Sequence, residues 1–230
     1  MIPKTALIVG AGAGLSASVA RKLAAQGTKV ALAARSLEAN SELAEALGGR
    51  AYRCDASETE DVNALFEAVE DDLGSPDFVL YNSSARAKGP FVDLDPADVE
   101  KAILVSAYGG FLVAQQAAKR MVPAGGGAIF FTGASASVKG YPQSAPFAMG
   151  KFALRGLAQS IARELQPQNI HVAHFVIDGA IRNPGRTEPA DNPDSMLDPD
   201  AIAETYMAVL AQSRSAWTWE IELRPWVERF

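Results

Sequence analysis

A glycine-rich turn follows the first apolar run of the chain and has the composition of a phosphate-binding loop. Gly10 and Gly14 come directly after the apolar residues 6–9, and an alanine-rich segment with helical spacing starts at Leu15. Glycines let a backbone turn tightly and approach a ligand, and the first amides of a helix attract an anion. Leu15 stands where the pattern G-x-G-x-x-G requires its third glycine, so G-x-x-x-G is the pattern that remains. We expect this turn to bind a diphosphate through Gly10, Ala13, Gly14 and Leu15.

Arg35 follows the second apolar run, where dinucleotide sites select between the two nicotinamide cofactors. NAD-binding sites usually carry an Asp or Glu there, whereas this chain has Ala34 followed by Arg35. A guanidinium binds the additional phosphate of NADP. After the third apolar run, Asp55 and Ala56 are expected at the adenine, where Asp55 either accepts from the amino group or caps the next turn. The sequence thus predicts NADP(H) as the preferred cofactor, with NAD(H) as the alternative.

Short apolar runs alternate with longer amphipathic segments along the chain. Runs that are apolar on both faces, separated by helices, indicate a parallel sheet covered on both sides. Right-handed crossovers then give a doubly wound fold. We predict an α/β, Rossmann-type fold with a mainly parallel sheet of about seven strands flanked by helices on both faces, forming a single dinucleotide-binding domain over residues 1–230. The predicted strands are residues 6–9, 29–33, 50–54, 78–81, 128–132, 171–177 and 217–223, and the predicted helices are 15–26, 37–47, 58–73, 96–122, 143–165 and 199–211.

The long irregular stretch of the chain is residues 182–198, which are rich in Pro, Asn and Asp. A connection of this length is either a lid over a substrate or a surface loop. As a lid it would turn Arg182, Arg186, Met196 and Leu197 toward an anionic or apolar substrate. The aromatic residues within 217–226 either cover the core or contact another subunit.

Composition and charge exclude several other classes of protein. A formal net charge of −6 disfavours nucleic acid or an anionic membrane as a partner. Cys54 is the only cysteine, so no internal disulfide forms, and only His171 and His174 could join it in a zinc site. We expect no signal peptide and no membrane span. These features predict a cytoplasmic protein with no metal.

Taken together, these positions resemble the short-chain dehydrogenase/reductase family over nearly the whole chain. Gly10 and Gly14 match the first two glycines of the family's G-x-x-x-G-x-G turn, and Ser16 stands at the third. Residues 81–84 replace its N-N-A-G run, with Asn82 matching, and residues 178–181 are similar to its P-G-x-I segment. The resemblance implies that Asn82, Gly179 and Ile181 border the cofactor. It also implies a homodimer or homotetramer formed through the two long helices.

The family's chemistry uses an Asn-Ser-Tyr-Lys set, in which Y-x-x-x-K places tyrosine and lysine on one helix face. The resemblance implies that Lys151 lowers the tyrosine pKa and holds the nicotinamide ribose, but the tyrosine position holds Phe147. The serine position falls on Ala134, beside Ser135, and the asparagine position falls near Ser106. A phenyl ring transfers no proton, and a positioned acid or base supplies about 10²–10⁴ in rate.

Three interpretations of Phe147 remain open. In the first, another group supplies the proton, and Ser135 is the best candidate. Tyr141 and Asp178 are the other candidates; if they have no such role, Tyr141 is a surface loop aromatic and Asp178 a turn residue. Alternatively, the acceptor needs no proton, as an iminium would not. In the third interpretation the protein is a catalytically inactive dinucleotide-binding sensor or partner subunit. We favour an NADP(H)-dependent oxidoreductase that transfers a hydride to or from a small-molecule organic substrate, with Lys151, Ser135 and Tyr141 as its candidate catalytic residues.

Overall fold

A parallel sheet of seven strands forms the centre of the described chain, which confirms the predicted fold class. The computed structural model describes residues 1–228. The strand order is β3-β2-β1-β4-β5-β6-β9, and every neighbouring pair is parallel. The strands are β1 (Thr5–Val9), β2 (Lys29–Ala34), β3 (Arg50–Arg53), β4 (Phe78–Tyr81), β5 (Gly127–Thr132), β6 (Ile170–Ile177) and β9 (Glu220–Leu223).

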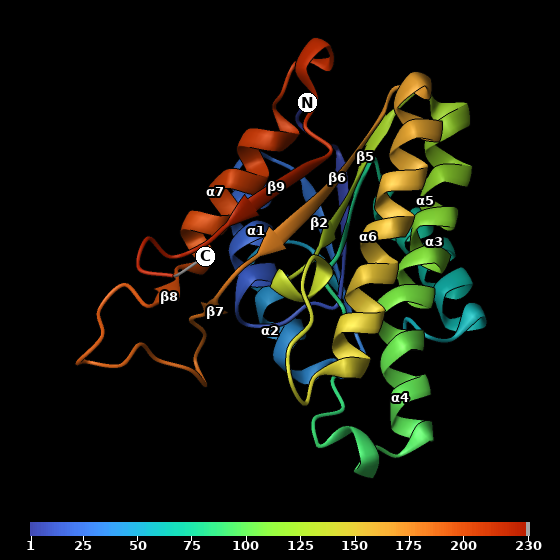
Figure 1. The fold of residues 1–230 in the computed structure, drawn as a ribbon. Coiled ribbons are helices and arrows are strands. Elements are labelled where there is room, and N and C mark those ends of the chain that lie inside the picture. Colours follow the sequence, from blue (N-terminus) through green and yellow to red (C-terminus); the bar gives the residue numbers. More distant parts are fainter. Residues whose placement is uncertain (229–230) are drawn as a thin grey trace.

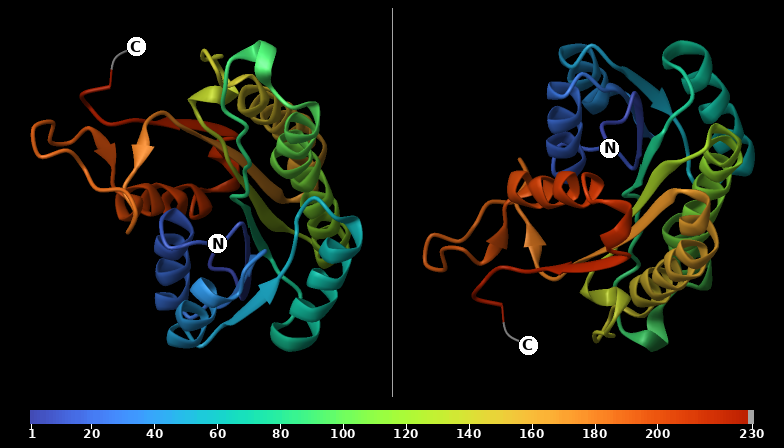
Figure 2. Two further views of the ribbon diagram at one scale, coloured as in Figure 1. Left: turned by 90° about the horizontal axis from the view of Figure 1, so that it is seen from below. Right: turned by 90° about the horizontal axis from the view of Figure 1, so that it is seen from above.

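Helices cover both faces of the sheet, as Figure 1 and Figure 2 show. Alternate residues of β1 point into different cores: Leu7 and Val9 join one, and Ala6 and Ile8 join the other. Because side chains alternate across a strand, a strand buried on both faces must be apolar throughout. One face carries α1 (Leu15–Ala25), α2 (Glu38–Ala46) and α7 (Pro199–Leu210), and the other carries α3 (Thr59–Leu73), α5 (Gly109–Ala124) and α6 (Ala145–Leu165).

The predicted continuous helix 96–122 is wrong, because a π-helical segment interrupts it. Helix α4 (Pro96–Ile103) is followed by the π-helical segment Leu104–Tyr108, and α5 then runs to Ala124. In the π segment the carbonyl of Val105 accepts a hydrogen bond from the Tyr81 hydroxyl. Ser106 Oγ accepts one from the Ala85 amide at 3.1 Å. The interruption therefore fixes the chain that leaves β4, in keeping with the frequent placement of π bulges at functional sites.

The stretch 182–198 is more ordered at its ends than predicted. The strands β7 (Ala180–Ile181) and β8 (Met196–Leu197) pair in parallel as a second, two-stranded sheet. Arg182 forms an ion pair with Asp198, the residue that caps α7. The stretch thus leaves and re-enters the body of the protein at one place, at the lower left of Figure 1.

The C-terminal strand begins at Glu220, three residues later than predicted. Trp217 instead stacks on His171 at 4.7 Å between ring centroids, and Trp219 packs against the core. Trp226 is exposed and donates a hydrogen bond to Asp194. Two of the three tryptophans thus cover this chain's own core. Short 3₁₀ turns complete the chain at Phe91–Asp93, Ser135–Ser137, Gln166–Gln168 and Arg214–Ala216.

Within residues 1–228, no helix combines the length and the apolar character needed to cross a membrane.

Candidate functional site

Two adjoining pockets open at the carboxyl ends of the central strands. They lie where β1 and β4 are neighbours and the strand order reverses, which is the usual ligand site of a doubly wound sheet. The larger pocket has a volume of about 470 Å³ and the smaller about 220 Å³. Gly10, Asn82 and Ser84 line both. The two pockets therefore adjoin at these residues, and we refer to them together as the groove, with a narrow and a wide end.

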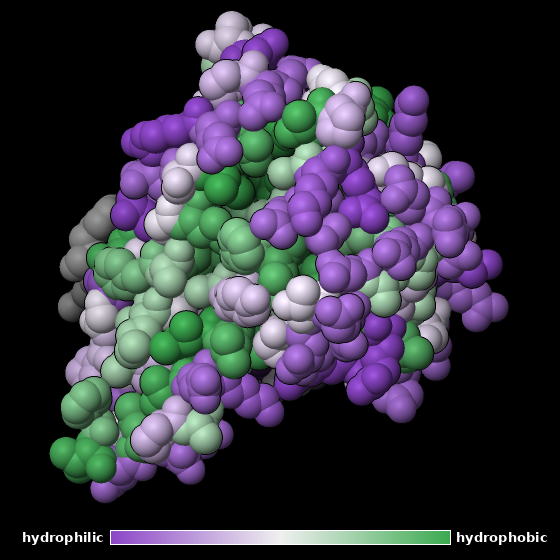
Figure 3. All heavy atoms as spheres, turned by 90° about the vertical axis from the view of Figure 1, so that its right-hand side faces the viewer, coloured by the Kyte–Doolittle hydropathy of each residue, from purple (hydrophilic) through white to green (hydrophobic). Residues whose placement is uncertain are grey.

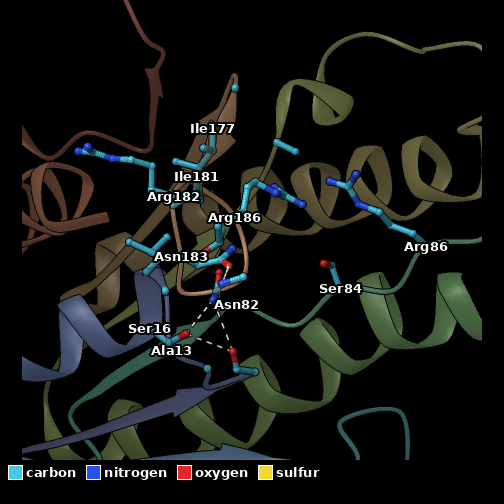
Figure 4. Close-up of a pocket in the computed structure, with 18 of the residues that line it drawn as sticks. Ala13, Ser16, Asn82, Ser84, Arg86, Ile177, Ile181, Arg182, Asn183 and Arg186 are labelled. Atoms are coloured by element: carbon cyan, nitrogen blue, oxygen red, sulfur yellow. Dashed lines mark hydrogen bonds between the residues drawn. The ribbon is translucent and has the colours of Figure 1, made fainter. Parts of the chain in front are cut away.

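The glycine turn is held against the end of β4. Gly10 has φ +84°, and a Cβ built on it would lie 2.4 Å from the Ser83 amide nitrogen. Ser16, at the position of the family's third glycine, is buried and donates from Oγ to the Gly10 carbonyl at 3.1 Å. Asn82 Nδ2 donates to Ser16 Oγ at 2.8 Å (Figure 4). Ser16 therefore preserves the turn through a hydrogen bond, and Gly10 has a steric reason to be glycine.

The N-terminus of α1 faces the wide part of the groove without a side-chain cap. Gly14 occupies the N-cap position and provides no side-chain hydrogen bond. A Cβ on Gly14 would lie 3.5 Å from Cβ of Asn183, so the start of the 182–198 stretch lies against this turn. First-turn amides with no protein acceptor are suited to an anion. Gly10, Ala13, Gly14 and Leu15, the four residues predicted to bind a diphosphate, all line the wide pocket.

Arg35, Asp55 and Ala56 line the narrow pocket. Asp55 accepts hydrogen bonds from the amide and the hydroxyl of Ser57 at 3.1 and 2.6 Å, so it forms the capping turn that was one of its two predicted roles. Burial works against ionisation, but these bonds and the charges of Arg35 and Lys101 lower the pKa of Asp55. The narrow end thus combines an ionised carboxylate with an exposed guanidinium.

Lys151 lies at the bottom of the wide pocket, on α6. Its side chain is buried, and Nζ donates to the Thr132 carbonyl at 2.7 Å. Burial, with a further contribution from the charge of Arg86, lowers the pKa of Lys151 to about 7. Gly179 and Ile181, which were predicted to border the cofactor, also line this pocket.

Phe147 lies one turn before Lys151 and presents its ring to the same pocket. The ring centroid is 4.0 Å from Cζ of Arg86 and 6.0 Å from Nζ of Lys151. Sequence reasoning missed Arg86, although the residue lies only two positions beyond the segment 81–84 that it singled out. The signal that could have identified Arg86 was its position shortly after the end of a strand.

Ser135 and Tyr141 lie in the β5–α6 connection, outside the lining of both pockets. Ala134 lines the wide pocket in place of Ser135, and Tyr141 is exposed beside Lys139. Two other tyrosines near the strand ends, Tyr81 and Tyr206, are fully buried. The hydroxyl of Tyr81 donates a hydrogen bond to the Val105 carbonyl, and the hydroxyl of Tyr206 is hydrogen-bonded to the Thr132 hydroxyl. Among the described residues, therefore, the lining contains no tyrosine hydroxyl.

This fold, glycine turn and helical lysine together define a class of protein. A family model described as enoyl-(acyl carrier protein) reductase matches residues 10–212. The chain belongs to the short-chain dehydrogenase/reductase family.

Individual relatives agree with this assignment. The chain is 31% identical over 180 residues to 3-oxoacyl-(acyl-carrier-protein) reductase MabA of Mycobacterium bovis, covering 78% of this chain and 70% of the relative. A short-chain dehydrogenase from Rhodopseudomonas palustris is 35% identical with a TM-score of 0.81, covering 96% of this chain and 98% of the other. At 24% identity, an alcohol dehydrogenase from Thermococcus sibiricus complexed with 5-hydroxy-NADP has the same fold, with a TM-score of 0.87 and 98% of each chain covered.

Proposed function

We propose that the protein is an NADP(H)-dependent oxidoreductase whose active site has Phe147 at the position of the family's tyrosine. One observation carries the proposal: two adjoining pockets bring Arg35, the bare amides of the glycine turn and the buried Lys151 to one edge of the sheet. An arginine, an uncapped helix N-terminus and a lysine in this order match the phosphates and the ribose of a phosphorylated dinucleotide. The Thermococcus sibiricus structure in complex with 5-hydroxy-NADP supports the same class of ligand.

Each predicted cofactor residue has a place in this assignment. The turn of Gly10, Ala13, Gly14 and Leu15 holds the diphosphate, and Arg35 holds the additional phosphate. Asp55 and Ala56 border the adenine, Lys151 holds the nicotinamide ribose, and Asn82, Gly179 and Ile181 border the remainder. The cofactor, when bound, supplies or accepts the hydride. The same narrow pocket accommodates NAD(H) with lower affinity, because Arg35 then has no phosphate to bind.

Proton transfer in this proposal falls to Lys151. Phe147 has no proton to give, and Ser135 and Tyr141 would have to move to reach the wide pocket. Lys151 lines that pocket and has a pKa near neutrality. A general acid works best when its pKa lies near the working pH. We expect kcat/KM for reduction to decline above pH 7, and Lys151→Arg to abolish turnover while keeping a positive charge.

Dinucleotide titration tests the cofactor assignment. Arg35→Ala is expected to raise the Kd for NADPH at least tenfold, because a charge-assisted contact to a phosphate is lost, and to change the Kd for NADH less than twofold. Arg53→Ala is the matched control, since Arg53 is also an exposed arginine at a strand end but lies outside the pocket lining. Failure of both dinucleotides to bind at millimolar concentration would refute the proposal.

A second candidate function is a dinucleotide-binding sensor or partner subunit without turnover. It is favoured by the absence of a tyrosine hydroxyl from the described pocket lining. Phe147→Tyr separates the two candidates. A ketone reductase activity that appears only in the variant supports the inactive protein. Turnover of ketones, imines or quinones by the wild-type protein supports the enzyme, and turnover of imines alone, as their positively charged iminium ions, supports an acceptor that needs no further proton.

We also propose that the protein forms a homodimer or homotetramer through α5 and α6. Phe111 on α5 and Phe152 on α6 are exposed by 41% and 45%. Figure 3 shows apolar surface between polar borders on the side of the molecule that these helices share with α3 and α4. Phe152→Arg should reduce the mass measured by light scattering to that of a monomer. Phe91→Arg, at an exposed position before α4, is the control and should leave the mass unchanged.

A further inference from the structure

The wide pocket carries an excess of positive charge. Among residues 1–228 its lining includes Arg86, Lys151, Arg182 and Arg186 but no Asp or Glu. Asp198 neutralises Arg182. The guanidiniums of Arg86 and Arg186 have no ion pair in the same part of the chain. The pocket therefore contains two arginines whose charge no described carboxylate balances.

These two arginines come from segments far apart in the sequence and face one another. Figure 4 shows their side chains extending toward each other across the pocket. Partial burial and the charge of Arg186 lower the pKa of Arg86, as expected where two guanidiniums face one another. Like charges at close range destabilise one another, and an anion between them would reverse the sign of that interaction.

Arg86 is held in place at this position. The Phe147 ring lies 4.0 Å from its Cζ, a cation–π contact that covers one side of the guanidinium. The backbone before it is fixed by the hydrogen bond from the Ala85 amide to Ser106 Oγ. A guanidinium supported on an aromatic ring keeps its N–H donors available for a planar or tetrahedral oxyanion.

We propose that Arg86 and Arg186 bind an anionic group of the substrate, a carboxylate or a phosphate, beside Phe147 and Lys151. The inference rests on the proposed function and adds to it the substrate class. Phe147 then has a role of its own. Its ring supports Arg86 as a tyrosine ring would, but it adds no hydroxyl that could bind the substrate anion in place of Arg86. Neutral substrates of equal size are discriminated against, since they leave both arginines unpaired.

The cofactor's own phosphates are the other source of an anion, and calorimetric titration distinguishes the two. The full-length protein is first saturated with NADPH and then titrated with benzoate, with its neutral isostere benzamide, and with inorganic phosphate. We expect benzoate or phosphate to bind at least tenfold more tightly than benzamide. Arg86→Met and Arg186→Met should each remove at least tenfold of that affinity, and each should leave the Kd for NADPH within twofold of the wild-type value.

Lys88→Met is the matched control, because Lys88 is an exposed cation two residues from Arg86 and lies outside the pocket lining. It should change neither titration. Equal binding of benzoate, phosphate and benzamide, or no binding of any of them, overturns the inference. A tenfold loss of NADPH affinity in both arginine variants also overturns it, because the arginines would then serve the cofactor. Failure of the wild-type protein to bind NADPH is a separate result that overturns the proposed function itself.

Discussion

Replacement of Lys151 by methionine should stabilise the unloaded protein while removing its function. The ammonium of Lys151 is buried and donates a hydrogen bond to the Thr132 carbonyl, and the like charge of Arg86 acts on it. The folded protein therefore binds the proton of Lys151 poorly, with a pKa of about 7 against 10.5 for an ordinary lysine. Methionine has a similar length and no charge, so it relieves this unfavourable burial.

The magnitude follows from linkage between protonation and folding. A folded-state pKa below the unfolded value means that the unfolded chain binds more protons between pH 7 and 10.5, so wild-type stability rises with pH across that range. The penalty is full below pH 7 and amounts to about 5 kcal/mol, from about 1.4 kcal/mol per pKa unit. At pH 9.5 roughly 1.4 kcal/mol of it remains. Methionine loses the hydrogen bond to Thr132 and leaves that carbonyl unpaired, which costs about 1–3 kcal/mol.

The net effect of Lys151→Met therefore changes with pH. At pH 6 the variant should be more stable than wild type by about 3 kcal/mol, which raises Tm by about 6–12 °C in a chain of this size. At pH 9.5 the gain should vanish or reverse. Thermal unfolding of the cofactor-free protein, followed by circular dichroism at both pH values, measures the difference. NADPH binding should weaken in the same variant.

Lys119→Met provides the control, because Lys119 is exposed on α5 and its replacement should leave Tm unchanged at both pH values. The reasoning is refuted if Lys151→Met is less stable than wild type at pH 6. A stability difference that does not depend on pH would also refute it, since burial of the charge would then not be the cause.

Three further predictions concern stability. Gly10→Ala should lower stability by about 3 kcal/mol and abolish NADPH binding, because φ is +84° and the new Cβ would lie 2.4 Å from the Ser83 amide nitrogen. Urea unfolding measures the stability, and titration with NADPH measures the binding. Burial lowers the pKa of His174 to about 4, so stability present above pH 6.5 should fall by about 3 kcal/mol toward pH 4. His174→Gln should flatten that decline in urea midpoints measured at pH 7.5 and 4.5, and an unchanged slope would contradict the assignment. Asp198→Ala should lower stability by about 1 kcal/mol through loss of the α7 cap, and faster proteolysis within 182–198 should accompany it because Arg182 loses its partner.

The sequence by itself predicted the fold that the structure confirms, and it located the residues that we propose for the cofactor. Strands such as β1 are apolar at every position because both of their faces are buried, and that pattern is visible without coordinates. The glycine turn and Arg35 were located in the same way, since the ends of parallel strands meet at one edge of the sheet. The predicted boundaries of strands and helices were correct to within a few residues wherever glycine, proline or a change in the spacing of apolar residues marked them.

Only the tertiary structure reveals the pair of arginines that we propose as the substrate half of the site. Arg86 and Arg186 are a hundred residues apart in the chain, and their approach depends on β4 and β6 lying on either side of β5. The π segment after α4 has no recognisable pattern in the local sequence, because it is stabilised by a contact with a distant residue. The Val105 carbonyl accepts a hydrogen bond from the Tyr81 hydroxyl. Likewise, the placement of Ser135 and Tyr141 outside the pocket linings depends on how the β5–α6 connection packs. Local residue patterns encode periodicity and backbone freedom. The positive charges around Lys151, by contrast, come from distant segments that only folding brings together.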